Sequence, residues 1–484
     1  MRFSLLMIAT CHLLPIVIGT NICHAQSGTW VAVYGGEQYD RGRGIAQTFD
    51  KGYIVCGPSS SYGMGNTDFY LLKIDSAGKY QWQNTFGGIN IENCFSVEQT
   101  KDSGFVICGY TNSFGAGGYD AYLVKTNSLG ILQWEKTFGG SDWDFAYWAE
   151  QTNDGGYILC GETYSFGNNS QAYLVKTNSA GNLLWEKNFG ISNKEAGKEV
   201  HQTFDNGYIF AGYITNDGGD ANFYLVKTDS AGTKKWEKNF GGAGDDICNS
   251  VALCADGGFL LGGHSVINGT EKFHFMKTTS TGAVVFSNTD APSSSNKSIT
   301  RIRETDDDTI VFIMNSDIGG LGGQEIVLLK YEIMWSWFPF VHTFGGINDD
   351  EGYDFVQTAD SGYALVGFTA TFGTGPDNIF IAKTNRNGDY NTSINSFVSV
   401  NEISEKEDGF LIYPNPSNGR LHISNSKFQA SAIRIYNLVG QNIFQSENIV
   451  YNSEVNISSL PQGVYLLEIL FEEGIAREKI IISK

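Results

Sequence analysis

Residues 94–140 read CFSVEQTKDSGFVICGYTNSFGAGGYDAYLVKTNSLGILQWEKTFGG, and this stretch decides the fold. It holds four short runs rich in β-branched and aromatic residues. A tight turn at residues 101–104, a glycine-rich loop at 111–119 and a second turn at 127–130 separate these runs. Apolar runs bounded by glycine, asparagine and aspartate are typical of β-strands. The stretch therefore predicts one four-stranded antiparallel unit.

The same unit recurs seven times between Trp30 and Lys383, with a period of about 51 residues. Each copy carries a lysine in its third strand, and these lysines are Lys73, Lys125, Lys176, Lys227, Lys277, Lys330 and Lys383. A tryptophan normally follows nine residues later, just before an aromatic-Gly step, as at Trp82, Trp134, Trp185 and Trp236. Nine residues after Lys383, however, comes Thr392. The missing tryptophan is Trp30, at the other end of the chain, where Tyr34-Gly35-Gly36 follows it.

A sheet of four short strands cannot bury both faces alone, so such units stack radially into a β-propeller. Seven copies predict seven blades over residues 26–387. The position of Trp30 predicts that the N-terminal strand completes the last blade and closes the ring, which removes a free sheet edge. The predicted fold class is therefore all-β, a seven-bladed propeller followed by a small immunoglobulin-like β-sandwich.

The outer turn of several copies has the spelling Gly-x-x-x-Trp, as at Gly78 to Trp82, Gly130 to Trp134 and Gly181 to Trp185. This pattern resembles that of tryptophan-docking β-propellers. The resemblance covers five copies when Trp30 is included, and phenylalanine replaces the tryptophan in the fifth and sixth copies. It implies that each tryptophan packs against the neighbouring blade.

Residues 1–25 have the features of a signal peptide. Arg2 is the basic start, residues 5–18 form a short apolar run, and Cys23-His24-Ala25 predicts cleavage between Ala25 and Gln26. The run is too short for a membrane span, and no later segment is apolar enough, so we expect no transmembrane segment. The protein is therefore expected to be exported.

The net charge of −20 excludes nucleic acid as a partner, because few groups are available to neutralise a phosphate backbone. Acidity of this size is typical of a soluble exported protein. Cys56, Cys108 and Cys160 share one repeat position that other copies fill with alanine, glycine or valine. This substitution pattern predicts small buried thiols that form no disulfide.

Residues 388–408 lack the repeat and predict a linker, and residues 409–484 form a second domain. Its motifs resemble the C-terminal sorting domain of the type IX secretion system of Bacteroidota. The motifs are Tyr413-Pro414-Asn415-Pro416 with Gly419, the turn at Gly440, Gly463-Val464-Tyr465, and the terminal run ending at Lys484. The resemblance implies a β-sandwich that contacts the secretion machinery and delivers the protein to the cell surface or the medium, across the outer membrane.

An acid lies four residues after the Gly-Gly step in six copies. These acids are Asp40, Glu92, Asp144, Glu195, Asp246 and Asp350. One interpretation is local, with each carboxylate accepting backbone N–H bonds in its own loop. The other is a ring of charge at the channel mouth that binds a polar ligand or calcium. Beyond calcium the sequence predicts no cofactor and no metal.

The copies disagree at one position of the inner strand, where the frame is otherwise uniform. This column reads Arg43, Phe95, Tyr147, Lys198, Asn249 and Tyr353, and the same strands bring Trp148, Glu199 and Asp354. A position free of structural demand can serve a ligand, so these side chains are candidates for binding; drift without function is the alternative.

The sequence contains no metalloprotease, nucleophile-elbow or phosphate-loop motif, and we assign no catalytic residue. The favoured hypothesis is a surface propeller that binds a glycan, a peptide or a partner protein. A secreted hydrolase or lyase that uses carboxylates at the axis is the first alternative, although six equivalent acids single out no pair. A structural protein of the surface layer is the second.

Overall fold

The computed structural model describes residues 28–167, 169–190, 194–215, 218–289, 297–317, 323–333, 337–390, 394–399, 410–413, 417, 419–425, 430–437, 442–447, 453–471 and 474–482. The described residues contain strands and no helix. They divide into two compact units, residues 1–399 and 400–484. The predicted cleavage site at Ala25 and Gln26 lies outside the described residues.

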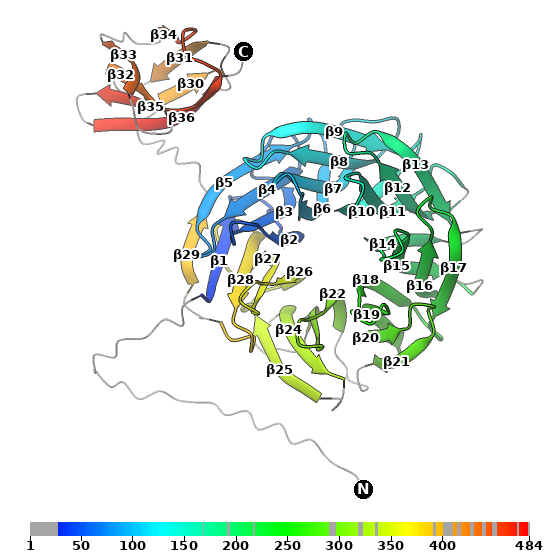
Figure 1. Ribbon diagram of the computed structural model, residues 1–484. Coiled ribbons are helices and arrows are strands. Elements are labelled where there is room, and N and C mark those ends of the chain that lie inside the picture. The colour runs from blue at the N-terminus through cyan, green and yellow to red at the C-terminus, as the bar shows by residue number, and fades with distance from the viewer. Residues whose placement is uncertain are drawn as a thin grey trace, which may run out of the picture. The chain divides into compact units, whose positions relative to one another are not determined.

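Six sheets of the first unit consist of four consecutive antiparallel strands, arranged side by side around a centre (Figure 1). Blades 1 to 3 are β2 (Gly44–Gln47), β3 (Tyr53–Ser59), β4 (Asp68–Ile74), β5 (Tyr80–Phe86); β6 (Glu92–Gln99), β7 (Phe105–Thr111), β8 (Asp120–Thr126), β9 (Leu132–Phe138); and β10 (Asp144–Gln151), β11 (Tyr157–Thr163), β12 (Gln171–Thr177), β13 (Leu183–Phe189). Blades 4 to 6 are β14 (Glu195–Gln202), β15 (Tyr208–Thr215), β16 (Ala221–Thr228), β17 (Lys234–Phe240); β18 (Asp246–Leu253), β19 (Phe259–Ile267), β20 (Thr270–Thr278), β21 (Val284–Thr289); and β22 (Lys297–Glu304), β23 (Ile310–Ser316), β24 (Glu325–Glu332), β25 (Trp337–Phe344).

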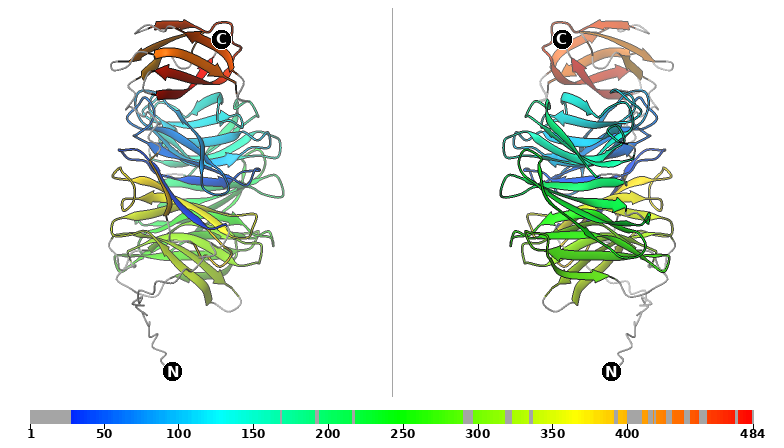
Figure 2. Two further views of the ribbon diagram at one scale, coloured as in Figure 1. Left: turned by 90° about the vertical axis from the view of Figure 1, so that its left-hand side faces the viewer. Right: turned by 90° about the vertical axis from the view of Figure 1, so that its right-hand side faces the viewer.

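The seventh sheet has the order β26 (Asp350–Gln357), β27 (Tyr363–Thr369), β28 (Asn378–Thr384), β1 (Trp30–Gly35) and β29 (Ile394–Ser399). The described part of the chain therefore forms the all-β fold and the seven blades that the repeat predicts. The first strand of each blade lies innermost, and in the side views of Figure 2 the connecting loops lie at the two faces of the ring.

The N-terminal strand β1 is the outer neighbour of β28 in the seventh sheet. Trp30 lies opposite Lys383, just as Trp82 lies opposite Lys73 in blade 1. The sequence did not predict the fifth strand of this sheet: β29 pairs in parallel with β1 and lies within the range that the sequence indicated as a linker. Its six residues, INSFVS, lack the turn signals that mark the other strands.

The core lies between neighbouring blades. One cluster joins Ile54 and Leu71 of blade 1 to Val97, Phe105 and Ile107 of blade 2, and similar clusters follow around the ring. Burial of both sheet faces explains the near-continuous apolar second and third strands. All six cysteines of the described residues are buried and free, as the variable small position predicts.

The lysine and aspartate of the repeat bind each other within a blade. Lys125 is buried, and its Nζ lies 3.0 Å from a carboxylate oxygen of Asp102 in the inner hairpin turn. The same ammonium donates to the backbone carbonyl of Thr126 at 2.7 Å. Blades 1, 3, 4 and 7 repeat this contact, so these residues belong to the frame and are not candidates for ligand binding.

Each outer-strand tryptophan packs on the turn glycine of the next blade, as the resemblance implied. The glycines that meet a tryptophan ring in this way are Gly78, Gly130, Gly181, Gly232 and Gly282. At Gly181, which has a φ of +73°, an added Cβ would lie 2.6 Å from Cζ3 of Trp134. Only glycine combines this backbone conformation with room for the ring.

We therefore expect Gly181→Ala to destabilise the propeller more than Gly155→Ala does. Gly155 has a similar φ of +79° but no atom within 4 Å of an added Cβ, so it carries the backbone strain without the clash. The strain costs about 1 kcal/mol at both positions, and overpacking against Trp134 adds about 1–3 kcal/mol at Gly181. Denaturant unfolding of both variants measures the difference, and equal midpoints would contradict ring packing at this glycine.

The second unit contains two sheets. One has the order β30 (Phe410–Tyr413), β31 (Arg420–Asn425), β34 (Ser453–Asn456), and the other β33 (Asn442–Glu447), β32 (Ala430–Tyr436), β35 (Gly463–Phe471), β36 (Gly474–Ile482). Side chains of both sheets share one buried cluster, which includes Ile423, Val455, Ile435 and Leu467. Of the predicted sorting motif, Gly419, Gly463 and Tyr465 are described, and Tyr413 lies in β30. Pro414, Asn415, Pro416, Gly440 and Lys484 lie outside the described residues.

Candidate functional site

The inner strands carry a β-bulge at the position where the repeats disagree. In β6 the pairing with β7 steps from Cys94 to Ser96 and leaves Phe95 unpaired. The same step leaves Tyr147, Lys198, Asn249, Thr300 and Tyr353 unpaired in β10, β14, β18, β22 and β26. Arg43 takes the equivalent place directly before β2. A β-bulge changes the direction of a side chain, so that it no longer packs with the rest of its strand, and bulges are frequent next to active sites.

The bulge residues meet in one cavity at the centre of the ring, which we call the axial cavity. Its volume is about 270 Å³, and it is lined by Arg43, Phe95, Tyr147, Lys198, Asn249, Thr300, Arg301 and Tyr353. The structure thus brings together all six residues of the variable column. Sequence reasoning missed Thr300 and Arg301, because blade 6 lacks the Gly-Gly step and the acid that fix the register of the other copies.

Two cations of the axial cavity rest on tyrosine rings instead of carboxylates. The guanidinium of Arg43 lies 3.7 Å from the ring centre of Tyr353, and Nζ of Lys198 lies 3.8 Å from that of Tyr147. Burial lowers the pKa of both cations, and the nearby Tyr353 and Glu162 offset this effect in part. The cavity is consequently cationic, although the whole chain is strongly acidic.

A buried charge network lies directly beside this cavity. Glu199 binds Arg301 at 3.0 Å and Arg303 at 2.8 Å, and Arg301 also binds Asp354 at 2.9 Å. Burial would raise the pKa of Glu199, but the two arginines hold it well below its usual value. Trp148, another predicted site residue, lies beneath Arg301, with 4.4 Å between the guanidinium and the ring centre. Trp148 does not line the axial cavity, and its predicted contact with a ligand stays a prediction.

A second cavity of about 370 Å³ opens on the other side of Trp148. Its polar lining consists of Glu98, Glu150, His201, Arg303, Glu304, Asp354 and Gln357. The sequence did not indicate a role for His201, whose ring nitrogens lie 2.8 Å from Glu150 and 3.0 Å from Glu199. Burial opposes the charge of His201, but the two carboxylates raise its pKa to about 9. One repeat position, three residues after the bulge, holds Glu98, Glu150, His201 and Arg303, and the charges at that position in the aligned repeats could have indicated them.

Glu98 is the unusual acid of the second cavity. Burial raises its pKa to about 7, against the bond that it accepts from Gln151 N at 2.6 Å, and the charge of Glu150 adds to the shift. Below pH 4.5, the ordinary pKa of a glutamate, Glu98 is protonated in both the folded and the unfolded protein and does not lower the free energy of unfolding. Between pH 4.5 and about 7 the unfolded state loses this proton more readily than the folded state, so the free energy of unfolding falls as the pH rises.

We therefore expect Glu98→Gln to raise the free energy of unfolding at pH 8 by roughly 2–3 kcal/mol and to leave it unchanged at pH 4. The introduced amide keeps an oxygen that can accept the bond from Gln151 N. Thermal unfolding at both pH values measures this, with Glu37→Gln as the exposed control. An equal effect at pH 4 and pH 8 would show that titration of Glu98 is not its source.

The six repeated acids have local roles. All are buried, and five of them accept a backbone N–H bond in the loop that leads to the inner strand of their blade. Asp144 accepts from Gly140 N at 2.9 Å, from Ser165 Oγ at 2.6 Å and from the Thr163 hydroxyl. The same backbone bond runs from Gly36 to Asp40, Gly88 to Glu92, Gly242 to Asp246 and Gly346 to Asp350, at 2.7–2.9 Å. Glu195 is likewise buried. This geometry supports the first of the two interpretations, and a ligand role for these carboxylates stays a prediction.

The glycine-rich loops on the same face also use their acids locally. Asp68 accepts from Gly65 N at 2.9 Å, Asp120 accepts from Gly117 N at 3.2 Å, and Asp377 binds Arg41 at 2.5 Å. Within the described residues, no group of three or more His, Cys, Asp and Glu side chains is placed to hold a metal ion.

Asp144→Ala is expected to lower the free energy of unfolding by about 3 kcal/mol, because three buried donors lose a charged acceptor. The exposed Glu37→Ala is the control. Excess calcium should leave the melting temperature of the unaltered protein where it is, since these carboxylates are already bound. A clear rise with calcium would instead reveal a site that includes them.

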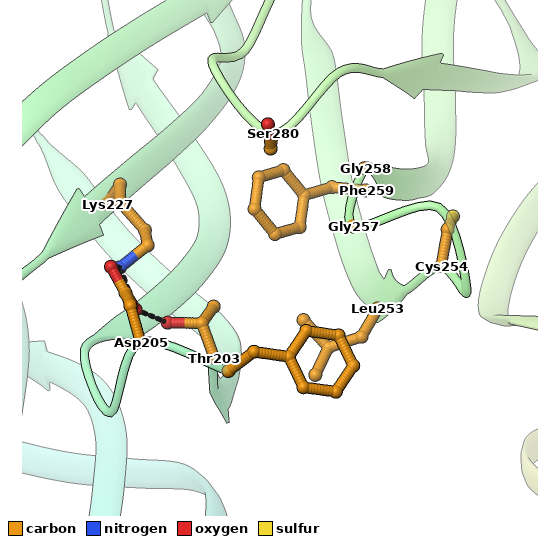
Figure 3. Close-up of a pocket in the computed structure, with 10 residues that line it drawn as sticks. Thr203, Asp205, Lys227, Leu253, Cys254, Gly257, Gly258, Phe259 and Ser280 are labelled. Atoms are coloured by element: carbon orange, nitrogen blue, oxygen red, sulfur yellow. Dashed lines mark hydrogen bonds and ion pairs between the residues drawn. The ribbon is translucent and has the colours of Figure 1, made fainter.

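A third crevice, of about 330 Å³, lies between the inner hairpins of blades 4 and 5. At the other junctions a side-chain oxygen from one blade accepts a backbone N–H of the preceding hairpin; these acceptors are Gln47, Gln99, Gln151, Gln202, Glu304 and Gln357. Leu253 takes this place in blade 5. Figure 3 shows Phe259 on one side of the crevice and the Lys227–Asp205 pair on the other. None of the predicted site residues lines it.

Comparison with known proteins identifies the second unit. Residues 411–483 match the family of the secretion system C-terminal sorting domain, which confirms the prediction from the four motifs. No curated protein matches the chain.

Among solved structures, the chain is similar to Sqt1 from Chaetomium thermophilum, with 10% identity and a TM-score of 0.42 over 73% of this chain and 98% of that one. It is also similar to BBS1N in complex with ARL6DN, with 10% identity and a TM-score of 0.44 over 74% and 98% of the two chains. A third similar structure is PorZ, a surface component of the type-IX secretion system of Porphyromonas gingivalis. The identity is 11% and the TM-score 0.26, over 94% of this chain and 70% of that one.

The sorting domain and the repeated sheets together define the protein at a coarse level. It is a β-propeller protein sorted by the type IX secretion system, and its C-terminal domain interacts with that machinery. It is consequently exported, to the cell surface or to the medium. In the part of the chain that the structure describes, no helix has the length and apolarity to cross a bilayer.

Proposed function

We propose that this exported propeller is a binding module that takes its ligand in the axial cavity. One observation carries the proposal: the positions at which an otherwise uniform repeat disagrees line a single cavity. Side chains that only pack would be subject to the same constraint in every blade. Their divergence, together with the bulges that turn them toward the axis, favours recognition of one asymmetric ligand.

Binding is favoured over catalysis by the chemistry of the lining. The axial cavity presents cations, aromatic rings, an amide and a hydroxyl, and no carboxylate lines it. The repeated acids that could have supplied a catalytic pair are buried in their loops. A positioned acid and base close to a reacting group are what glycoside cleavage needs.

Arrays of glycans and peptides, probed with the purified full chain, test this function. We expect hits that Phe95→Ala removes and that Phe204→Ala keeps, because Phe95 lines the axial cavity whereas Phe204 is 83% exposed in the third crevice. Hits that survive Phe95→Ala but not Phe204→Ala would move the binding site to the crevice.

The second cavity favours the alternative of a secreted hydrolase. Glu98, with its pKa near 7, is placed in the same cavity as Glu150 and has the protonation behaviour of a general acid. Assays of the full chain against polysaccharide and peptide panels distinguish the two functions. Turnover that Glu98→Gln abolishes would replace binding by catalysis as the conclusion.

A purely structural role in the surface layer is the remaining alternative, and it predicts no array hit and no turnover. We also propose the route of export. Residues 1–25 direct the chain into the periplasm, with cleavage before Gln26, and the sorting domain then carries it across the outer membrane.

A further inference from the structure

Two of the three cations that line the axial cavity, Arg43 and Lys198, share an unusual arrangement on different sides of the ring. Arg43 lies over Tyr353, whose hydroxyl donates to Glu351 at 2.6 Å. Lys198 lies over Tyr147, whose hydroxyl donates to Glu162 at 3.1 Å. In each case the cation lies over the face of a tyrosine ring, and the acid is hydrogen-bonded to the tyrosine hydroxyl, so the ring face contacts the charge without taking up its N–H donors.

Other cations near the axis are committed in a different way. Arg301 binds Glu199 and Asp354, and Arg41 binds Asp377. Within the described residues, Arg43 and Lys198 have no hydrogen-bonded carboxylate, and Nε of Arg43 is buried without any hydrogen-bond partner.

Leaving buried donors unsatisfied is costly, and most proteins pair such groups. Burial lowers the pKa of both side chains, which is the signature of desolvated charge without a full counter-charge. An anion in the cavity would supply acceptors for the N–H donors of these side chains. The guanidinium is suited to a carboxylate in particular, because its planar donors match the two oxygens.

The remaining lining indicates what carries the anion. Phe95 contributes an apolar ring, whose centre lies 5.2 Å from that of Tyr147. The amide nitrogen of Asn249 donates to Ile299 O at 2.9 Å and to Ser298 Oγ at 3.2 Å, which directs its amide oxygen to accept from a ligand. A volume of about 270 Å³ lies just below the range of ligand pockets for drug-sized molecules, which starts near 300 Å³. One ring with hydroxyls and a carboxylate fits, and a folded segment does not.

We propose that the axial cavity binds a uronic acid unit of an acidic polysaccharide, with its carboxylate between Arg43 and Lys198 and its ring against Phe95. This inference rests on the proposed binding function and names the ligand class of the same site. In this proposal the residues of the variable column contact the ligand: Arg43 and Lys198 bind its charge, and the other residues of the column fit its shape.

Isothermal titration of the full chain with glucuronic and galacturonic acid, against glucose and galactose, tests the inference. The acidic and neutral sugars differ only at the carboxylate. We expect the uronates to bind at least about tenfold more tightly, with an affinity that falls as salt is added. Arg43→Met and Lys198→Met should each lose about tenfold, while the exposed Arg386→Met and Lys235→Met should lose nothing. Melting temperatures establish that all variants are folded.

Other outcomes would distinguish failure of the proposed ligand from failure of the proposed binding site. Equal binding of neutral and acidic sugars, sensitive to Phe95→Ala but not to Arg43→Met, would keep the axial site and overturn the acidic ligand. Acidic peptides that bind in place of uronates, with the same dependence on Arg43 and Lys198, would overturn the sugar. Ligands that bind with no dependence on any of the three residues would overturn the axial site itself.

Discussion

Removing residues 26–36 from the full chain is expected to unfold the propeller and not merely to trim it. These residues contain β1, which lies between β28 and β29 in the seventh sheet. The same strand contacts blade 1: Trp30 Nε1 donates to Ser76 O at 3.0 Å, and the Tyr34 hydroxyl donates to Gly78 O. We propose that β1 thereby closes the ring, since without it blades 7 and 1 would each expose an apolar edge.

The single substitution Trp30→Ala is the graded form of this experiment. Trp30 is 3% exposed, and burial of a tryptophan of this kind is worth about 3–5 kcal/mol. We expect a fall of that size in the free energy of unfolding by denaturant. Trp143→Ala is the matched control because Trp143 is 50% exposed. If Trp30→Ala and Trp143→Ala have the same small effect, β1 does not close the ring and other contacts hold it together.

Deleting residues 402–484 is expected to trap nearly all of the protein in the periplasm. The deletion removes the sorting domain, which matches the family over residues 411–483, and leaves the propeller unit of residues 1–399 whole. Cell fractionation with an antibody to the propeller measures the location. Protease resistance of the periplasmic form shows that it is folded, so that misfolding does not explain its retention. Truncated protein in the medium or on the cell surface would mean that another signal directs export.

The architecture was predictable because its signal is repeated. Seven copies of a four-strand pattern define each boundary several times over, and the displaced Trp30 indicated the partner of β28. Strand β29 was missed because it occurs once, in a segment without turn signals, and pairs with a strand from the other end of the chain. The sequence of β29 occurs once, so no other repeat supports its assignment as a strand. Its pairing also depends on the free edge of β1, which exists only in the folded seventh sheet.

The candidate site was predictable to the extent that its residues are those at which the aligned repeats differ. The six residues of the variable column, from Arg43 to Tyr353, line the axial cavity together with Thr300 and Arg301, which the sequence did not indicate. Their chemistry was not predictable. The choice of tyrosine rings over carboxylates as neighbours of Arg43 and Lys198, and the contact of Arg301 with Glu199 two blades away, depend on the angles between blades.

At the position of the repeated acids, by contrast, six of the blades agree. Six carboxylates at one position suggested a ring of charge, yet each is buried and serves its loop. Repetition of a polar residue in every blade indicates a structural duty, just as it does for the lysine that binds the hairpin aspartate. We propose that recognition in this fold lies in the residues that the blades do not share.

The most direct test of this claim is a crystal structure of the full chain with the uronate that binds most tightly. The account predicts ligand density in the axial cavity, with a carboxylate between the guanidinium of Arg43 and the ammonium of Lys198 and a sugar ring against Phe95. Density beside Glu98 in the second cavity, or on the acid-bearing loops with the axial cavity empty, would contradict it.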